Sequence, residues 1–170
     1  MTRIKLAVLM TVIFMAAFSL ASVAAEKDIL REIQDRAQIE KLMWNYARAL
    51  DTGNAEAYIA TYAEDGQFGR GDSAVKGREA LRKMMTPSKS APSAKAKSQQ
   101  MPAMYHMTAN HYIEFIDKDH AVFHGYWLAF VTTSGEKAQT SIAGVGREVN
   151  ELVRVNGKWL IQVRDVMPQD

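Results

Sequence analysis

The sequence predicts a single α+β domain in which helices come first and an antiparallel sheet follows. Three observations support this fold class. Apolar residues recur at helical spacing from Glu26 to Leu50, and the last third of the chain is rich in β-branched and aromatic residues. The Asn156–Gly157 pair suits a tight hairpin between the last two predicted strands. In such a domain the first helix must lie across the sheet, because only there can it bury its apolar stripe.

The first 25 residues have the pattern of a secretory signal peptide. Arg3 and Lys5 precede an uncharged run from Leu6 to Ala25 that ends in small residues, which predicts cleavage after Ala25. The alternative is an uncleaved anchor, since a run of about 20 uncharged residues is long enough to span a bilayer. Cleavage leaves one domain, residues 26–170, in the periplasm or outside the cell, with no membrane contact.

Charge and composition exclude several function classes. The signal segment holds two of the 21 basic residues and none of the 19 acidic residues, so the remainder carries 19 of each sign. The pI of about 8.8 therefore belongs mostly to the precursor, and no electrostatic argument for nucleic-acid binding remains. The absence of cysteine excludes disulfides and thiolate catalysis, which in an exported protein fits a bacterial periplasm.

The first half of the domain is predicted to be mainly helical. The long helix from Glu26 to Leu50 ends at Gly53, and Asn54 can cap a second short helix that runs through Tyr62. The stripe of this long helix is formed by Ile29, Ile33, Ile39, Leu42, Met43, Tyr46 and Leu50. The letters "AEDGQF" then predict a short extended piece, and "GREALRKMM", residues 77–85, a third helix.

A long loop and four strands complete the domain. Residues 86–103 contain three prolines and exceed the usual length of a connection, so they form either a mobile lid or a disordered segment. Strands are predicted at residues 104–116, 121–132, 138–155 and 158–166. Strand alternation places His106, Thr108 and Asn110 on one face of the first strand and His111 on the other.

Single residues leave the chemistry open. Asp51 faces the negative end of its helix dipole, at a cost of about 0.3–1 kcal/mol if exposed, so a partner is expected. Taken alone, it can equally cap the turn that follows. His120 is placed in a turn and His124 on a surface or in a pocket. With His106 and His111 on opposite faces, no cysteine and no paired carboxylates nearby, the sequence predicts no metal site and no cofactor.

A series of segments carries more information than any single residue. "YARALD", "TYAEDGQF", "VKGREAL", "YHMTANHYIEF" and "LVRVNGKWLIQVR" occur in this order and cover about residues 32–166. The series resembles the SnoaL-like families of the nuclear transport factor 2-like superfamily. This resemblance implies a cone-shaped α+β barrel, in which a strongly curved sheet is wrapped by N-terminal helices around a deep pocket. It also makes a homodimer an expectation.

The pattern is most similar to the scytalone dehydratase, bile acid 7α-dehydratase and hexachlorocyclohexane dehydrochlorinase families. In these lyases an aspartate at the end of the first helix pairs with a strand histidine, and Asp51 and His106 match those positions. Arg164 and Tyr46 fall where members carry a pocket arginine and a tyrosine. The resemblance thus implies four catalytic residues, and three more are expected to bind substrate: Trp127, Asn110 and Glu148.

Two departures from the family pattern qualify these expectations. The strand "GYWLAF" has no histidine to match the additional one of scytalone dehydratase, and Glu148 stands where many relatives have a tyrosine.

The expected function is an exported lyase that removes a proton and a small leaving group from a small hydrophobic or alicyclic molecule. A ketosteroid-isomerase-like or polyketide-cyclase-like enzyme is an alternative, and it would use an inward-facing acid on the sheet, Glu148 or Glu114, as its base. A non-catalytic binding module is the other alternative. In a module that uses its sheet exterior, Phe123, Trp127 and methionines would fill the cavity and leave Asp51 and His106 out of contact.

Overall fold

The computed structural model describes residues 2–86, 103–133, 135 and 138–168, and for residues 2–25 it describes the backbone alone. The chain divides into two units, Met1–Ala37 and Gln38–Asp170. The predicted loop of residues 86–103 lies, apart from its two end residues, outside the described part. Among the residues whose side chains are described, no helix is long and apolar enough to cross a membrane.

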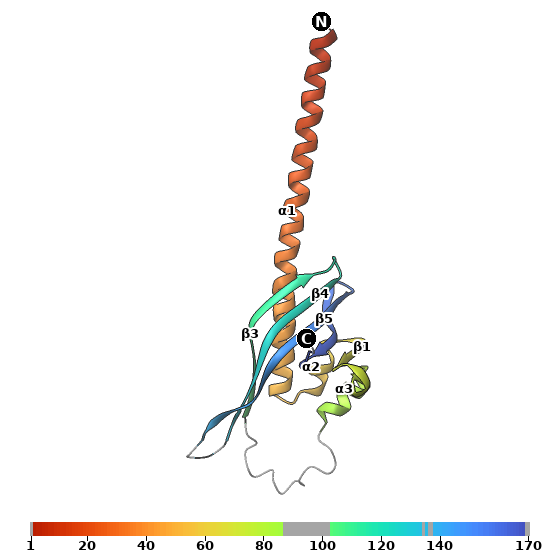
Figure 1. Cartoon of the computed structure of the whole chain (residues 1–170). Helices are drawn as coiled ribbons and strands as arrows, with labels where there is room; N and C mark the ends of the chain where they lie inside the picture. The colour runs from red at the N-terminus through yellow and green to blue at the C-terminus, as the bar shows by residue number, and fades with distance from the viewer. Residues whose placement is uncertain (1, 87–102, 134, 136–137, 169–170) are drawn as a thin grey trace. The chain divides into compact units, whose positions relative to one another are not determined.

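Helix α1, Thr2–Asp51, is one continuous helix and is longer than predicted (Figure 1). The predicted stripe is buried only in its second half. Ile39 is fully buried, whereas Ile29 and Ile33 are 61% and 58% exposed. The difference arises because the first unit contains no described element other than this helix, so its apolar side chains find no core there.

Two short helices follow α1 in the sequence and precede the long strands. Helix α2, Ala55–Ile59, begins as predicted at Asn54, whose side chain accepts a hydrogen bond from the Ala57 N–H at 2.9 Å. The prediction that it runs through Tyr62 was wrong, since Tyr62 pairs with β6 and opens strand β1, Tyr62–Phe68. A single 3-10 turn, η1 (Gly71–Ser73), strand β2 (Val75–Lys76) and helix α3 (Arg78–Met85) follow.

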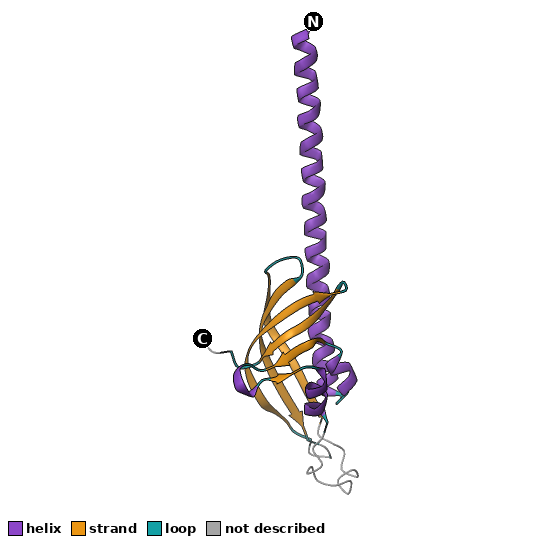
Figure 2. Cartoon of the chain, turned by 90° about the vertical axis from the view of Figure 1, so that its right-hand side faces the viewer, coloured by secondary structure: helices purple, strands orange, loops and turns teal. Residues whose placement is uncertain are grey.

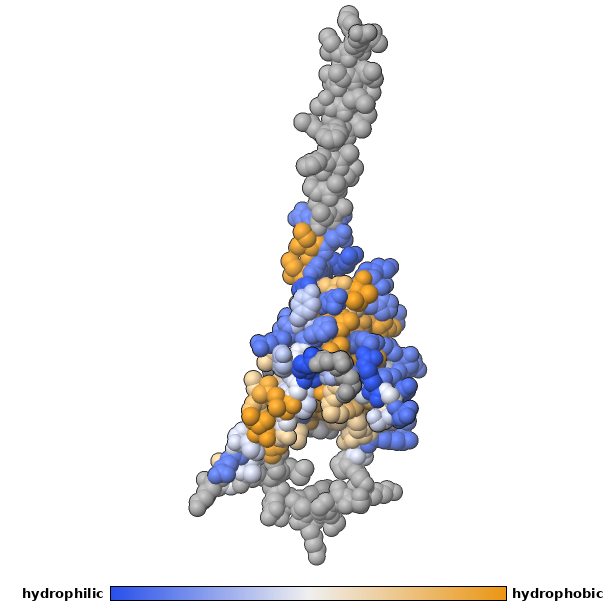
Figure 3. All heavy atoms as spheres, viewed as in Figure 1, coloured by the Kyte–Doolittle hydropathy of each residue, from blue (hydrophilic) through white to orange (hydrophobic). Residues whose placement is uncertain are grey.

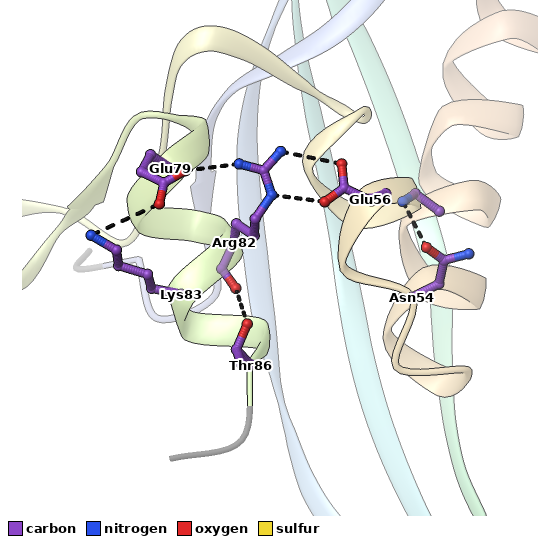
Figure 4. Close-up of polar contacts among 7 residues, drawn as sticks. Asn54, Glu56, Glu79, Arg82, Lys83 and Thr86 are labelled. Atoms are coloured by element: carbon purple, nitrogen blue, oxygen red, sulfur yellow. Dashed lines mark hydrogen bonds and ion pairs between the residues drawn. The ribbon is translucent and has the colours of Figure 1, made fainter. Parts of the chain in front are cut away.

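An arginine fork joins α3 to α2. Arg82 donates to both oxygens of Glu56, at 2.7 and 3.2 Å, and to Glu79 one turn earlier on α3 at 2.8 Å (Figure 4). The pKa of Glu56 is lowered, mainly by its hydrogen bonds with Arg82. These contacts join α3 to α2 at the surface, where the Arg82 and Glu56 side chains are 38% and 73% exposed.

The four predicted long strands are all present. They are β3 (Ala103–Phe115), β4 (His120–Thr132), β5 (Thr140–Val155) and β6 (Lys158–Asp165). Among the described residues the sheet has six strands in the order β2-β1-β6-β5-β4-β3, antiparallel except for the β1–β6 pair. The sheet is strongly curved (Figure 2). This confirms the predicted cone-shaped α+β fold with a mixed sheet.

The core of the second unit lies between the concave face of this sheet and the helices. It contains Ile39, Leu42, Met43, Tyr46, Tyr58, Ile113, Phe123, Leu152 and Ile161, all less than 9% exposed. Burying each large apolar side chain contributes about 1.5–3 kcal/mol, so this cluster holds the end of α1 firmly against the strands. Other apolar side chains remain exposed, including Tyr105, Tyr112, Tyr126, Ile142 and Val145. Figure 3 shows apolar side chains gathered over the lower part of the long strands.

A β-bulge interrupts β3 at Asn110. The register with β4 shifts between Ala109 and Tyr112, and Asn110 has a φ of 47°, which is uncommon for a residue other than glycine. Because the bulge adds one residue, the predicted alternation does not continue past it. The placement of His111 on the face opposite His106 was therefore wrong: the His111 ring stacks on the buried Phe123 at 5.3 Å between centroids.

Candidate active site

Asp51 and His106 form a close pair although they are 55 residues apart in the sequence. The carboxylate oxygen Oδ1 of Asp51 accepts a hydrogen bond from the backbone N–H of His106 at 2.9 Å and lies 2.8 Å from the ring Nδ1. The Asp51 side chain is 7% exposed and that of His106 is 24% exposed. The carboxylate is thus nearly buried, while the imidazole reaches toward an open space.

The position of each partner explains the contact. Asp51 is the last residue of α1, and His106 lies on β3, which is an edge strand of the sheet. An edge strand leaves every second backbone N–H without a strand partner, and Asp51 accepts one of these. Arg48, one turn earlier on α1, lies 3.5 Å from the other carboxylate oxygen. These partners offset the cost of an acid at the negative end of the helix dipole.

The contact with Asp51 affects which nitrogen of the His106 imidazole can accept a proton. A neutral His106 that donates its Nδ1 hydrogen to Asp51 keeps the lone pair on Nε2, the nitrogen that can accept a proton. An ionised carboxylate at hydrogen-bond distance also stabilises the imidazolium that forms afterwards. Such an arrangement can serve as a base and the group that orients it.

His106 stands on the wall of a mostly apolar cavity of about 240 Å³. Three other predicted site residues line the same cavity: Tyr46, Trp127 and Arg164. The remaining walls are Ala47, Leu50, Tyr58, Phe68, Met84, Met107, Thr108 and Val166. The structure therefore brings His106 together with Tyr46, Trp127 and Arg164 around one space, with Asp51 directly behind His106.

Arg164 belongs to a buried polar network behind this cavity. It forms an ion pair with Glu148, which is 1% exposed, and donates to Asn150 Oδ1 at 2.9 Å. Thr108 and Asn150 each donate to the Glu148 carboxylate at 3.1 Å. Within the described part of the chain the buried Nε–H of Arg164 has no acceptor. Such an unsatisfied donor is rare and costs about 1–3 kcal/mol.

Three tyrosines pack together beside Arg164. The Tyr46 ring lies 4.5 Å from the Arg164 Cζ atom, and the Tyr58 and Tyr62 hydroxyls are 3.0 Å apart. Burial raises the pKa of Tyr58 and of Tyr62 well above the ordinary value of 10. These hydroxyls therefore stay protonated, and one of them donates its hydrogen to the other.

Trp127 can pack in its observed position because two residues of β5 that lie opposite it are glycines. A Cβ atom on Gly146 would lie 2.8 Å from the indole Nε1, and one on Gly144 would lie 3.0 Å from the six-membered ring. The indole N–H lies within hydrogen-bond distance of the Arg147 and Val166 carbonyl oxygens, at 3.2 and 3.0 Å. The two glycines thus allow this large side chain to lie flat against the sheet as a wall of the cavity.

The other predicted residues lie elsewhere. Asn110 is exposed at the bulge and is not among the residues that line the cavity. Glu148 is buried behind Arg164 and also does not line it. Glu114 and His124 lie 3.7 Å apart and are half exposed, and His120 pairs with Asp117 at 2.9 Å on the surface.

Sequence reasoning missed several wall residues. Leu50, Phe68 and Met84 were placed in predicted helices or strands but were not predicted to line the cavity. Their closeness in the sequence to the matched segments is the signal that could have indicated this role. Thr108 was placed on the His106 face, but its contact with Glu148 was not predicted, and neither were the contacts of Asn150 with Glu148 and Arg164. Among the described residues no group of three or more His, Asp or Glu is arranged to hold a metal ion.

Comparisons with known proteins agree with this architecture. The model of the SnoaL-like domain family matches residues 31–165. No curated protein matches the chain. Among solved structures, a nuclear transport factor 2-like protein with a cystatin-like fold from Novosphingobium aromaticivorans is 22% identical, with a TM-score of 0.67 and coverage of 84% of this chain and 87% of that one.

Two further solved structures are similar. A putative scytalone dehydratase from Novosphingobium aromaticivorans is 21% identical, with a TM-score of 0.62 over 79% of this chain and 84% of that chain. A protein from Catenulispora acidiphila in complex with S-DNPA is also 21% identical, with a TM-score of 0.61 over 78% of this chain and 91% of that one. At this level of identity the similarities establish the fold, and one of the neighbours holds a small ligand.

Proposed function

This chain belongs to the SnoaL-like domain family, and from this premise we propose that it is a dehydratase-like lyase acting on a small hydrophobic or alicyclic substrate. The observation that carries the proposal is the Asp51–His106 contact of 2.8 Å at the wall of an apolar cavity. A base fixed by a buried carboxylate beside a space for substrate is what proton abstraction requires.

In the proposed reaction His106 Nε2 takes a proton from the carbon next to an electron-withdrawing group. The C–H electron pair becomes the new C=C bond, and the bond from the neighbouring carbon to the leaving group breaks, so the leaving group departs with the electron pair of the bond that broke. When the leaving group is hydroxyl, protonated His106 returns its proton to it, so water forms and the base is restored. A positioned histidine contributes typically about 10²–10⁴-fold to such a step.

Tyr46 and Arg164 line the same cavity as His106 and can support this step. The Tyr46 hydroxyl can donate to a carbonyl or leaving oxygen. Arg164 can stabilise negative charge as it develops. Because Glu148 already pairs with Arg164 and balances much of its charge, we assign Arg164 the smaller share of this stabilisation.

The alternatives fit the contacts less well. A ketosteroid-isomerase-like reaction needs a sheet carboxylate as base, but the Glu148 carboxylate is occupied by Arg164, Asn150 and Thr108. A binding module with a filled cavity would keep Asp51 and His106 apart. The open cavity and the close Asp51–His106 pair support an enzyme.

Proton abstraction can be measured before the natural substrate is known. Cyclic ketones with a β-hydroxyl or β-halogen are incubated with the full-length protein in D₂O, and loss of the α-hydrogen and appearance of the enone are followed by NMR. We expect turnover with the wild type and a loss of at least about 100-fold in His106→Ala. His120→Ala is the matched control, because His120 also pairs with a carboxylate but lies on the surface. Equal rates in all three proteins would overturn the proposal.

A further inference from the structure

A groove of about 830 Å³ lies between helix α1, helix α2 and the start of strand β6. It shares no lining residue with the His106 cavity, because a different face of α1 lines it. The α1 wall of the groove is a stripe of polar residues at a spacing of three and four, which places its members on one face of the helix. The members of the stripe are Gln38, Lys41, Asn45, Arg48 and Thr52.

The charged residues of this groove are all basic. Among the described residues, those that line it include Lys41 and Arg48 of α1 and Lys158 of β6, and they include no aspartate or glutamate. Arg48 lies 3.5 Å from Asp51, but Lys41 and Lys158 are exposed, and neither side chain has an ion-pair partner in the described part of the chain. We therefore name this space, defined by Lys41, Arg48 and Lys158, the cationic groove.

The cationic groove also offers apolar surface and neutral hydrogen-bonding groups. Leu42, Ala49 and Trp159 line it and are less than 9% exposed, so they form its floor. The side-chain amides of Gln38 and Asn45 are exposed and make no hydrogen bond to any residue that the structure describes. A side-chain amide both donates and accepts, which matches the N–H and C=O groups of a peptide main chain. The groove therefore suits a peptide that carries negative charge.

The length of the groove fits an extended peptide. From Gln38 to Thr52 the helix rises by about 21 Å, at about 1.5 Å per residue. A chain in the polyproline II conformation covers that distance in about seven residues, and its side chains return to the same side every three residues, about 9.3 Å. Lys41 and Arg48 are separated by a similar distance along α1, about 10.5 Å. One acidic segment can therefore reach both cations.

We propose that the cationic groove binds an extended acidic segment of a partner protein. Lys41, Arg48 and Lys158 pair with carboxylates of the segment, and Gln38 and Asn45 form hydrogen bonds with its main chain. A groove whose charges are all positive attracts such a segment, repels a basic one and speeds association with the acidic partner. The inference goes beyond the proposed lyase, since the groove and the cavity that would hold the substrate are separate sites.

Binding of a simple acidic peptide to the full-length protein tests the groove. Fluorescence anisotropy compares labelled heptaglutamate with labelled heptaglutamine, both capped at each end. We expect heptaglutamate to bind at least about tenfold more tightly, because the neutral peptide lacks the attraction to three cations. This preference should shrink as the salt concentration rises from about 50 to 300 mM, since salt screens exposed charges.

Variants locate the binding in the groove. Lys41→Glu with Lys158→Glu replaces two attractions by two repulsions and should bring the ratio of the two affinities close to one. Lys76→Glu with Lys118→Glu is the matched control, because it makes the same change of net charge at exposed lysines outside the groove, and it should keep the ratio. Asn45→Ala should weaken heptaglutamate about threefold, the effect of one hydrogen bond, without changing the salt dependence.

Several outcomes would overturn the proposal. One is equal affinity for the two peptides, and another is a ratio that Lys41→Glu with Lys158→Glu leaves unchanged. Displacement of heptaglutamate by inorganic phosphate, but not by chloride at the same ionic strength, would show a site for small anions instead. Sedimentation with phosphatidylglycerol vesicles that this variant abolishes would assign the groove to a membrane surface, and an oligomer that the variant dissociates would assign it to a second copy of the chain.

Discussion

At the scale of single residues, the Oδ1 atom of Asp51 has two tasks. It accepts the free backbone N–H of an edge strand and it holds the His106 ring. The first task is structural and joins the end of α1 to β3. In the proposed function the second is chemical, because a ring that donates from Nδ1 to Asp51 leaves Nε2 free to accept a proton. A substitution at Asp51 must therefore be judged on stability and on activity separately.

We expect Asp51→Asn to leave the fold intact and to remove most of the activity. The amide oxygen can still accept the His106 N–H, so the stability loss should be about 1 kcal/mol or less, but an amide cannot stabilise the imidazolium. His106→Ala should lose a similar amount of kcat/KM, and the double variant little more than either single one, since groups that act as a unit are not additive. Turnover assays with thermal melts measure both effects. Full activity of Asp51→Asn at a lowered Tm would leave only the structural role.

Arg164→Lys should lower both activity and stability. A lysine keeps the charge but cannot bond to Glu148 and Asn150 while also stacking on Tyr46, since its ammonium lacks the planar fork. Removing one partner of a buried ion pair costs about 3–5 kcal/mol, and the lysine should lose part of that. Urea unfolding with kcat measurement checks this. Arg70→Lys is the control, because Arg70 pairs with Glu151 and Asp165 while half exposed; an equal loss there would contradict the special role of Arg164.

At the scale of elements, α2 and the start of β1 bring the Tyr58 and Tyr62 hydroxyls to the core beside the cavity. Their raised pKa has a consequence for stability at alkaline pH. Below pH 10 both the folded and the unfolded chain keep these protons, so stability does not change on their account. As the pH rises through 10, the unfolded chain loses protons that the folded chain retains, and the free energy of unfolding falls.

Tyr58→Phe should make this alkaline decline less steep. Removing one such group lowers the slope by about 1.4 kcal/mol per pH unit above pH 10. Chemical unfolding between pH 8 and 11.5 measures the slope, and Tyr126→Phe is the control because Tyr126 is 48% exposed. The same slope in the wild type and in Tyr58→Phe would show that Tyr58 ionises as readily in the folded chain as in the unfolded one.

At the scale of the whole molecule, export remains a prediction. We expect mature protein purified from the producing cell to begin at Glu26, because the small residues before it suit a signal peptidase. N-terminal sequencing of the exported protein decides this. A sequence that begins at Met1 or Thr2 would support the membrane anchor instead.

The oligomeric state also remains a prediction. The resemblance to the nuclear transport factor 2-like superfamily makes a homodimer the expected state. Sedimentation equilibrium of the mature protein measures it, and a single species at the monomer mass over a wide concentration range would contradict the homodimer.

The order and type of the elements were predictable from the sequence, because local physics sets them. The Asn54 cap, the helix over residues 77–85 and all four long strands follow from side-chain period, capping and turn chemistry within a few neighbours. The matched segments also pointed to Asp51, His106, Tyr46 and Arg164, since a family pattern is itself a property of the sequence; the last three line one cavity and Asp51 contacts His106, while their catalytic roles stay predictions.

What only the tertiary structure decided is how these elements meet. The bulge at Asn110 depends on the partner strand β4, so no period within β3 reveals that His111 turns inward. The pairing of Glu148 with Arg164 depends on the neighbouring positions of β5 and β6, and it takes Glu148 out of the substrate space. The cavity lined by His106, Tyr46, Trp127 and Arg164 also depends on how the elements pack. Packing of the whole unit sets the cavity volume, the cross-strand partners and the contact between Asp51 and His106, which are 55 residues apart. No short stretch of the chain contains this information.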